Sequence, residues 1–424
     1  MPMPAVRRRP AGPDRRFTRR RQRLRAGLTQ LLFVGAGLVA GIYVPKITAG
    51  PTVSAGRIVE LLFTAGVTVI SLITVIYSLL FLVVQWVSGT FSMRLALFRD
   101  DPIVWRAFAY SIGIFSFCFT AAFAIGNDKT VSVIVPVLAF VLVIAALALM
   151  RVLQTRAFTS MLLAPTLSAI TERGRAIVEG LYAPAAGESR VPLSRPPLRR
   201  TVTWPHRLAV LQQLHLGPLV DAARRADAVV VLRQTVGATM LTGMPVADVH
   251  GGDLGDETVL RAVVTGPERS FDQDPQLAFR LLADVGLRAL SPAVNDPATA
   301  VQVIDAIEDL LTMLAARTVS ASQIADGEGT ARVVLSLPNW EQFACGAVDD
   351  LIAASENSPM VLLRLREMFQ RLTVVAPDDG GPVLSARADW VEGMLESGFP
   401  AIWSSVNCAS SAGTVDAQAV REDP

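Results

Sequence analysis

The chain has 424 residues, of which 51% are hydrophobic and only 18% charged, with a formal net charge of +2. It is therefore more apolar than an ordinary soluble protein of its size. The three cysteines are far apart and the three histidines lack metal-ligand spacing, which argues against a disulfide framework and against a zinc site.

Four stretches near the N-terminus contain no Asp, Glu, Lys or Arg. They are Ala26–Pro45, Leu61–Met93, Ala107–Asn127 and Thr130–Met150. Each reaches the roughly 20 residues that a helix needs to cross a hydrocarbon core about 30 Å thick. We therefore predict four transmembrane helices.

Arginine placement predicts the orientation of these helices. Ten arginines lie between Arg7 and Arg25, and others lie between the second and third stretches and after the fourth. The remaining two loops hold few cations, so the positive-inside rule places both the N-terminus and the C-terminus in the cytoplasm. The arginine run also suits anionic lipid. A nucleic-acid arm or a signal peptide is disfavoured, because a long apolar stretch follows without a small-residue cleavage site.

After the fourth stretch the sequence becomes more polar. A helical pattern continues to about Tyr182, and Gly187–Pro205 is rich in Pro and Arg and is interpreted as a linker. Alternation of β-branched residues with glycines in Ala228–Val249 predicts short strands and tight turns, and "TVLRAVV" and "ARVVLSL" are further strand candidates. Apolar residues at helical spacing predict four helices between Leu277 and Phe369.

The fold class expected is a membrane all-α bundle of four transmembrane helices followed by a cytoplasmic mixed α+β domain. The expected division is a basic N-terminus (1–25), the transmembrane domain (26–153), a juxtamembrane helix and linker (154–205), the α+β domain (206–376) and a weakly structured tail (377–424). One amphipathic segment, Ala388–Trp403, stands out in that tail.

The stretch "LSPAVNDPATAV", Leu290–Val301, interrupts an apolar helical pattern with two prolines. Both prolines lack an N–H and disfavour helical geometry in the residue before them. Asp296 is placed to cap a helix whose first residue is Pro297, and Asp274 with Pro275 repeats the pattern upstream. The stretch therefore predicts the end of one helix, a tight turn and the start of another.

These residues also carry a family resemblance. "ALSPAVNDPATAVQVIDAI" and the upstream "ERSFDQDPQLAFRLLADVGLRAL" resemble the signature of a bacterial family of predicted membrane proteins, domain of unknown function 2254, over roughly Leu28 to Val375. "FSMRLALFRDD" and "VGATMLTGMP" match further family elements, although Met93 stands where the family has proline. The resemblance implies N-terminal transmembrane helices and a soluble domain. No activity is established for the family, so the resemblance does not imply one.

Six polar residues of this signature are candidates for a site: Arg269, Gln273, Asp274, Ser291, Asn295 and Asp296. Neighbouring helix starts would bring them together. A buried network in which Arg269 pairs with an Asp is the favoured interpretation. Helix N-termini attract anions and clustered carboxylates attract hard cations, so a small ligand or a divalent cation is an alternative. A contact of these residues with another copy of the chain in an oligomer is a third interpretation.

Hydroxyl side chains recur along one face of the second apolar stretch: Thr64, Thr68, Ser71, Thr74 and Ser78. We call these five residues the hydroxyl stripe. Such a stripe can line a hydrated path, or its hydroxyls can form hydrogen bonds with the backbone of their own helix or with a neighbouring helix. The second interpretation, helix packing, is favoured. Small residues, Gly37 and Gly41 in the first stretch and Gly113 in the third, suit close helix packing.

The sequence contains no recognised catalytic motif and predicts no cofactor and no metal, so we do not expect an enzyme. The leading hypothesis is a homo-oligomeric protein of the bacterial inner membrane whose cytoplasmic domain is a regulatory or scaffold module coupled to the spans. The alternative is a channel-like conduit lined by the second span. Lipid, and above all anionic lipid, is the expected partner, and nucleic acid is not.

Overall fold

The computed structural model describes residues 15–90, 102–126, 128–161, 163–183, 196–319, 322–377 and 380–405. The chain divides into two compact units, Met1–Leu162 and Leu163–Pro424. The "FSMRLALFRDD" element and the chain beyond residue 405 lie outside the described residues.

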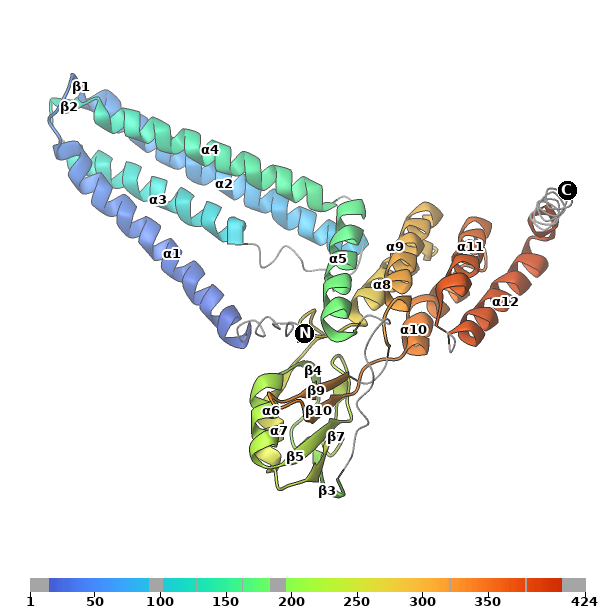
Figure 1. Ribbon diagram of the computed structural model, residues 1–424. Coiled ribbons are helices and arrows are strands. Elements are labelled where there is room, and N and C mark those ends of the chain that lie inside the picture. Colours follow the sequence, from blue (N-terminus) through green and yellow to red (C-terminus); the bar gives the residue numbers. More distant parts are fainter. Residues whose placement is uncertain are drawn as a thin grey trace, which may run out of the picture. The chain divides into compact units, whose positions relative to one another are not determined.

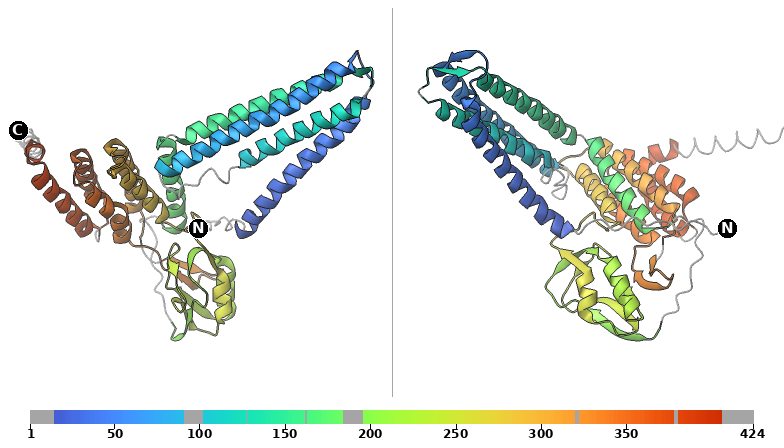
Figure 2. Two further views of the ribbon diagram at one scale, coloured as in Figure 1. Left: turned by 180° about the vertical axis from the view of Figure 1, so that it is seen from behind. Right: turned by 60° about the vertical axis from the view of Figure 1, so that its left-hand side comes forward.

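The described part of the first unit consists mainly of long helices (Figures 1 and 2). They are α1 (Arg15–Tyr43), α2 (Ala55–Thr90), α3 (Pro102–Ile125) and α4 (Ile134–Met161), with a short 3₁₀ helix, η1 (Val44–Lys46), after α1. Within the described residues, four segments are long and apolar enough to cross a membrane: Leu28–Lys46, Ala55–Leu79, Arg106–Ile125 and Ile134–Thr155. Each overlaps one of the four predicted stretches.

The loops after α1 and after α3 meet at one end of this unit. Strand β1 (Thr52–Ser54) pairs antiparallel with β2 (Thr130–Ser132), and the hydroxyl of Ser132 donates to the carbonyl oxygen of Ala49 at 2.7 Å. These two loops therefore lie at the same end of the helices.

Helices α1 and α3 approach closely because glycines replace side chains at the crossing. A Cβ on Gly37 would overlap the carbonyl oxygen of Gly113, and a Cβ on Gly41 would lie 2.7 Å from the Cβ of Thr120. On the other side of the contact, a Cβ on Gly113 would lie 2.9 Å from the carbonyl oxygen of Phe33. The predicted role of these small residues in helix packing is confirmed.

The second unit contains two sheets and a helical bundle. The five-stranded sheet has the order β3-β7-β5-β10-β9 and the three-stranded sheet the order β6-β4-β8, and β5–β10 is the parallel pair. The strands are β3 (Leu198–Thr203), β4 (Ala209–Leu214), β5 (Ala228–Leu232), β6 (Thr239–Met240), β7 (Pro245–Gly251), β8 (Val263–Gly266), β9 (Ser322–Ala325) and β10 (Ala331–Leu335). Two short helices, α6 (Leu216–Arg225) and α7 (Asp256–Ala262), accompany them.

The bundle is formed by the remaining helices of the second unit. They are α5 (Leu163–Leu181), α8 (Leu277–Leu290), α9 (Pro297–Ala315), α10 (Trp340–Ala354), α11 (Pro359–Val375) and α12 (Gly381–Gly398). The rings of Phe279 and Tyr182 both contact the ring of Phe343, with centroids 5.1 and 5.9 Å apart. The four helices predicted between Leu277 and Phe369 are confirmed as α8 to α11.

Three sequence predictions are wrong in detail. The predicted linker contains β3, which pairs with β7 as an edge strand. The "TVLRAVV" segment lies mostly in α7, and only its end enters β8. The tail predicted to be weakly structured contains α12, which begins before the predicted amphipathic segment Ala388–Trp403. Leu384, Val391 and Leu395 are buried there, and Arg387 forms two hydrogen bonds of 2.9 Å with the carboxylate of Asp349.

Candidate functional site

The first half of the signature forms a buried ion pair at the start of α8. The Nε and Nη2 of Arg269 donate to the two carboxylate oxygens of Asp274 at 2.6 and 2.7 Å, and the Asp274 side chain is fully buried. Two parallel N–H···O bonds fix both direction and distance, so this geometry is the strong form of an arginine–carboxylate pair. The predicted pairing of Arg269 with an Asp is confirmed.

A glycine from the sheet region closes over this ion pair. Gly237 has φ +97°, a backbone conformation that side chains disfavour, and a Cβ there would overlap Oδ2 of Asp274 and lie 2.9 Å from Nε of Arg269. Gly237 belongs to the "VGATMLTGMP" element, so two separate family elements meet at one contact. We call Gly237, Arg269 and Asp274 the signature joint.

Gln273 attaches the same loop to β4. Its Oε1 accepts from the backbone N–H of Leu214 at 2.8 Å, and its Nε2 donates to the carbonyl oxygen of Leu214 at 3.2 Å. The side chain thus satisfies both backbone groups at the end of the strand.

Burial raises the pKa of Tyr182, and the carboxylate of Asp274 raises it further, which keeps this phenol neutral beside the signature joint. The phenol donates to the carbonyl oxygen of Pro338 at 3.0 Å.

The second half of the signature forms the turn between α8 and α9. The hydroxyl of Ser291 donates to the carbonyl oxygen of Arg288 at 2.7 Å, and Asn295 has φ +49°, a conformation that Asn tolerates better than most residues. Asp296 caps α9, because its carboxylate accepts from the backbone N–H of Thr299 at 3.1 Å and from its hydroxyl at 2.6 Å. The predicted cap is confirmed.

The predicted cap at the preceding helix is wrong. Helix α8 begins at Leu277 with Gln276 as its N-cap residue, and no side chain caps it. Asp274 lies two positions before this N-cap residue. One of its oxygens accepts from the backbone N–H of Gln276 at 3.2 Å, but the carboxylate is chiefly bonded by Arg269.

The two halves of the signature are not brought together. Arg269, Gln273 and Asp274 lie at the start of α8, whereas Ser291, Asn295 and Asp296 lie beyond its end. A helix of 14 residues is about 21 Å long, so one ligand cannot contact both halves. The described residues also contain no group of three or more His, Cys, Asp or Glu side chains that could hold a metal ion. The expectation that neighbouring helix starts assemble the six residues was wrong.

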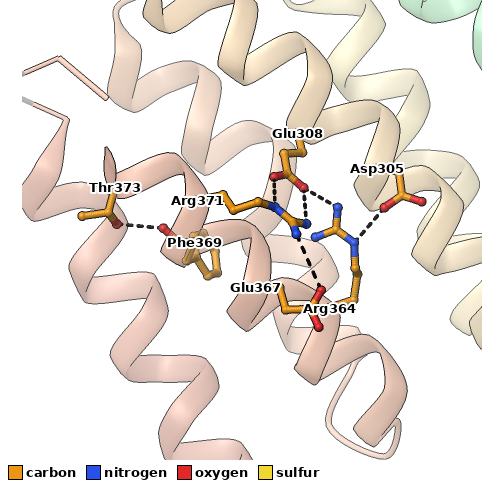
Figure 3. Close-up of polar contacts among 7 residues, drawn as sticks. All are labelled: Asp305, Glu308, Arg364, Glu367, Phe369, Arg371 and Thr373. Carbon is orange, nitrogen blue, oxygen red and sulfur yellow. Dashed lines mark hydrogen bonds and ion pairs between the residues drawn. The ribbon is translucent and has the colours of Figure 1, made fainter. Parts of the chain in front are cut away.

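An arginine network between α9 and α11 was not anticipated (Figure 3). Glu308 accepts from Arg364, and from the Nε and Nη2 of Arg371 at 2.6 and 3.0 Å, while Arg364 also donates to Asp305 at 2.7 Å. Burial alone would raise the pKa of Glu308, but the hydrogen bonds from Arg371 and Arg364 lower it overall. Glu308 and the two arginines lie on different helices, 56 or more residues apart, so no local sequence pattern marks them.

The hydroxyl stripe lies on the outer face of α2. Four of its side chains donate to the carbonyl oxygen four residues earlier in their own helix, at 2.7–2.9 Å: Thr64, Thr68, Thr74 and Ser78. All five are exposed in the single chain. The opposite face of α2 is apolar and buried, with Leu62, Val69, Ile73 and Ile76. The packing of α2 within the chain therefore uses the apolar face and not the stripe.

Comparison with known proteins identifies the family to which the chain belongs. The family described as "Predicted membrane protein (DUF2254)" matches residues 25–371, and the chain belongs to this family. Four apolar helices followed by a region of mixed helices and strands agree with that description.

Particular relatives are found in mycobacteria. The chain is 25% identical over 335 residues to the uncharacterized protein Rv1290c of Mycobacterium tuberculosis and to the uncharacterized protein Mb1321c of Mycobacterium bovis. The match covers 73% of this chain and 62% of each relative, so the chain spans less than two thirds of their length. No solved structure matches the chain.

Proposed function

We propose that the protein is a multi-pass protein of the bacterial cytoplasmic membrane whose second unit is a cytoplasmic regulatory or scaffold module coupled to the spans. The observation that carries this proposal is the direct junction between the units. Helix α4, which contains the fourth candidate span, ends at Met161, and α5 of the second unit begins at Leu163. Pro165 lies in the first turn of α5, where its missing N–H costs nothing.

Arginine placement supports the orientation. The cations concentrate before the first candidate span, Leu28–Lys46, and around the chain that connects α2 to α3, which the positive-inside rule assigns to the cytoplasm. The paired strands β1 and β2 then belong to the external side. Homo-oligomerisation through the spans and contact of the N-terminal arginines with anionic lipid are part of the same proposal.

A structural role for the signature accords with its geometry. At one end of α8 the polar groups bond to one another and to β4, and at the other end they shape a turn and cap α9. We infer that the signature holds the sheets and the helical bundle of the module in a fixed arrangement, rather than binding a small ligand or a divalent cation, and that the protein is not an enzyme.

The orientation is tested by thiol labelling of intact spheroplasts. Asp128→Cys, near β2, and Glu328→Cys, in the exposed turn between β9 and β10, form the matched pair in a background with Cys345→Ser and Cys408→Ser. A membrane-impermeant maleimide is expected to label Asp128→Cys directly and Glu328→Cys only after permeabilisation. Labelling of Glu328→Cys in intact spheroplasts would contradict the proposal.

One observation favours the alternative of a channel-like conduit. The hydroxyl stripe is exposed in the single chain, so several copies around an axis could direct it to a common hydrated path. Against it, four of the five hydroxyls already bond to their own backbone and need no water or neighbour. The regulatory or scaffold module is therefore the function that we favour.

A further inference from the structure

A groove runs along the start of α4, at the end of the first unit where β1 and β2 pair (Figure 1). One wall is the loop at residues 49–51, and the other is formed by residues 132–134 with Val137, Leu138 and Val141 of α4. We call it the α4 groove. Its volume is about 560 Å³, within the range of about 300 to 1,000 Å³ that is usual for small-molecule sites. Every residue of its lining belongs to the first unit.

Hydrogen bonds fix the two walls of the α4 groove against each other. The hydroxyl of Ser132 donates to the carbonyl oxygen of Ala49 at 2.7 Å, and the backbone N–H of Val133 donates to the carbonyl oxygen of Pro51 at 3.1 Å. The pairing of β1 with β2 begins directly beside these bonds, where Thr52 lies opposite Ser132. The groove is therefore shaped by the folded chain itself and needs no occupant to form it.

The side chains that line the α4 groove are almost entirely hydrocarbon. Ser132 has the only polar side chain among the lining residues, and it is 2% exposed with its hydroxyl bonded to Ala49. Val137 and Val141, by contrast, are 54% and 56% exposed and contribute methyl groups to the lining. A polar molecule would lose hydrogen bonds to water in this groove and gain none from a side chain. The chemistry of the lining therefore fits an alkyl chain.

The α4 groove lies along a candidate span and starts at the end of that span. Ile134 is the first residue of the fourth candidate span, and Lys46 is the last residue of the first. The ammonium of Lys46 lies 5.3 Å from the centroid of the Tyr43 ring, and tyrosine is enriched at the headgroup level of membranes. From Ile134 to Val141 the groove follows seven residues of helix, or about 10 Å, which is less than the roughly 15 Å of hydrocarbon in one leaflet. An acyl chain takes this direction, from the headgroups toward the centre of the bilayer.

The charge at this end of the unit favours a phosphate over a second copy of the chain. Residues 44–60 and 128–138 contain three cations, Lys46, Arg57 and Lys129, and two acids, Glu60 and Asp128. Lys46 is exposed and belongs to η1, which contacts α4. Copies in one membrane share one orientation, so a second copy would bring a like net charge to this end, whereas a phosphate would bring the opposite charge. The charge balance therefore complements the headgroup of a phospholipid.

We propose that the α4 groove binds one acyl chain of a membrane phospholipid, with the phosphate of that lipid beside Lys46. This inference rests on the proposed function, because it requires the four helices to be inserted. It goes beyond that function by assigning a lipid-binding site to the end of the spans that carries β1 and β2. Because the groove is preformed, its lipid is expected to stay with the chain in detergent, when the lipids that merely surround the spans are lost.

Native mass spectrometry tests this proposal by counting the phospholipids bound per chain. The full chain is purified in detergent from membranes that contain phosphatidylethanolamine and phosphatidylglycerol. Val137→Trp fills the groove from α4 and Ala49→Phe fills it from the loop, so the test does not depend on the folding of one variant. Ile144→Trp is the matched control, because Ile144 is 48% exposed on the same helix and does not line the groove. Lys46→Gln tests the phosphate contact, and extraction of the membranes with alkaline carbonate reports insertion separately.

We expect about one phospholipid per chain in the wild type and in Ile144→Trp, and roughly fivefold less in both filling variants, because their added rings occupy the groove. Lys46→Gln should retain roughly twofold less, as is usual for the loss of an exposed charge pair.

Absence of bound phospholipid from a wild-type chain that resists carbonate would overturn the inference and leave the proposed insertion intact. Equal retention in the wild type and in both filling variants, or an equal loss in Ile144→Trp, would also overturn it, because the lipid would then be bound elsewhere. Lipid-free dimers that the filling variants dissociate would assign the groove to a second copy instead. Unchanged retention in Lys46→Gln would overturn the phosphate contact. Release of the wild-type chain by carbonate would contradict insertion itself.

Discussion

The contacts that stabilise the first unit internally differ from those that stabilise the second. In the first, α1 and α3 approach because Gly37, Gly41 and Gly113 carry no side chains, and α2 packs through an apolar face. In the second, buried arginine–carboxylate pairs contribute: Arg269–Asp274 braces the loop before α8, and Arg364–Glu308 joins α9 to α11. In the membrane that we propose for the first unit, hydrophobic burial would give little net attraction between helices, so close packing would hold them together. The second unit uses buried charge instead.

Removing the carboxylate of the signature joint is expected to have the largest effect. Asp274→Ala leaves Arg269 partly buried without its partner and should lower the free energy of unfolding of the second unit by about 3–5 kcal/mol. Denaturant titration followed by the fluorescence of the buried Trp204 and Trp340 measures this loss. Glu257→Gln, in an exposed pair with Arg261, is the matched control and should change stability by less than about 1 kcal/mol. Equal effects of the two substitutions would contradict a central role for the joint.

The first unit is expected to respond to added volume. Gly37→Ala places a methyl group against the Gly113 carbonyl and should destabilise the α1–α3 contact by about 1–3 kcal/mol. Gly35→Ala lies on the same helix, and its added Cβ would meet no other side chain or neighbouring helix within 4 Å, so it should be neutral or stabilising. The rate at which a thiol reagent modifies Thr120→Cys, at a position on α3 that lies against Gly41 of α1, reports this contact. Similar rates in both variants would show that the glycine crossing does not hold the helices together.

The cap of α9 is expected to contribute less than either. Asp296→Ala removes the acceptor for two hydrogen bonds from Thr299 and should cost about 1 kcal/mol. Ser358→Ala is the matched control, because Ser358 is the N-cap residue of α11 but makes no capping hydrogen bond through its side chain. Thermal unfolding of both variants compares them, and a larger loss for Ser358→Ala would be inconsistent with the observed cap.

The smallest effect concerns pH. The hydroxyl and the backbone N–H of Thr299 donate to Asp296 and lower its pKa below the ordinary value of 3.8. Because the pKa is lower in the folded than in the unfolded chain, the stabilisation is present above that value and is lost as the pH falls through the folded pKa. The stability difference between wild type and Asp296→Ala should therefore narrow between about pH 5 and pH 2. A difference that stays constant over this range would refute the assignment.

The sequence predicted those features that depend on local patterns. Uninterrupted apolar stretches indicated the four candidate spans, and Asp296 before Pro297 indicated the start of α9. Such signals lie within a few residues of one another, so a single chain is enough to recognise them.

Features that depend on tertiary contact were missed. The closure of Gly237 over Asp274 joins residues 37 positions apart in the sequence. The contact of Glu308 with Arg364 joins residues 56 positions apart. Strand β3 lies in a Pro- and Arg-rich segment and is stabilised by pairing with β7, and α12 is stabilised by packing on α10 and α11. In each case the partner, and not the local sequence, determines the structure.

Ion flux from proteoliposomes containing the purified full chain tests the central claim most directly. The chain is compared with Thr68→Leu/Ser71→Leu in the hydroxyl stripe and with Phe140→Leu on the exposed face of α4. For a regulatory or scaffold module we predict no flux above that of empty vesicles for all three proteins, at several salts and pH values. Flux that the stripe variant loses and Phe140→Leu retains would contradict this account and identify α2 as the lining of a conduit.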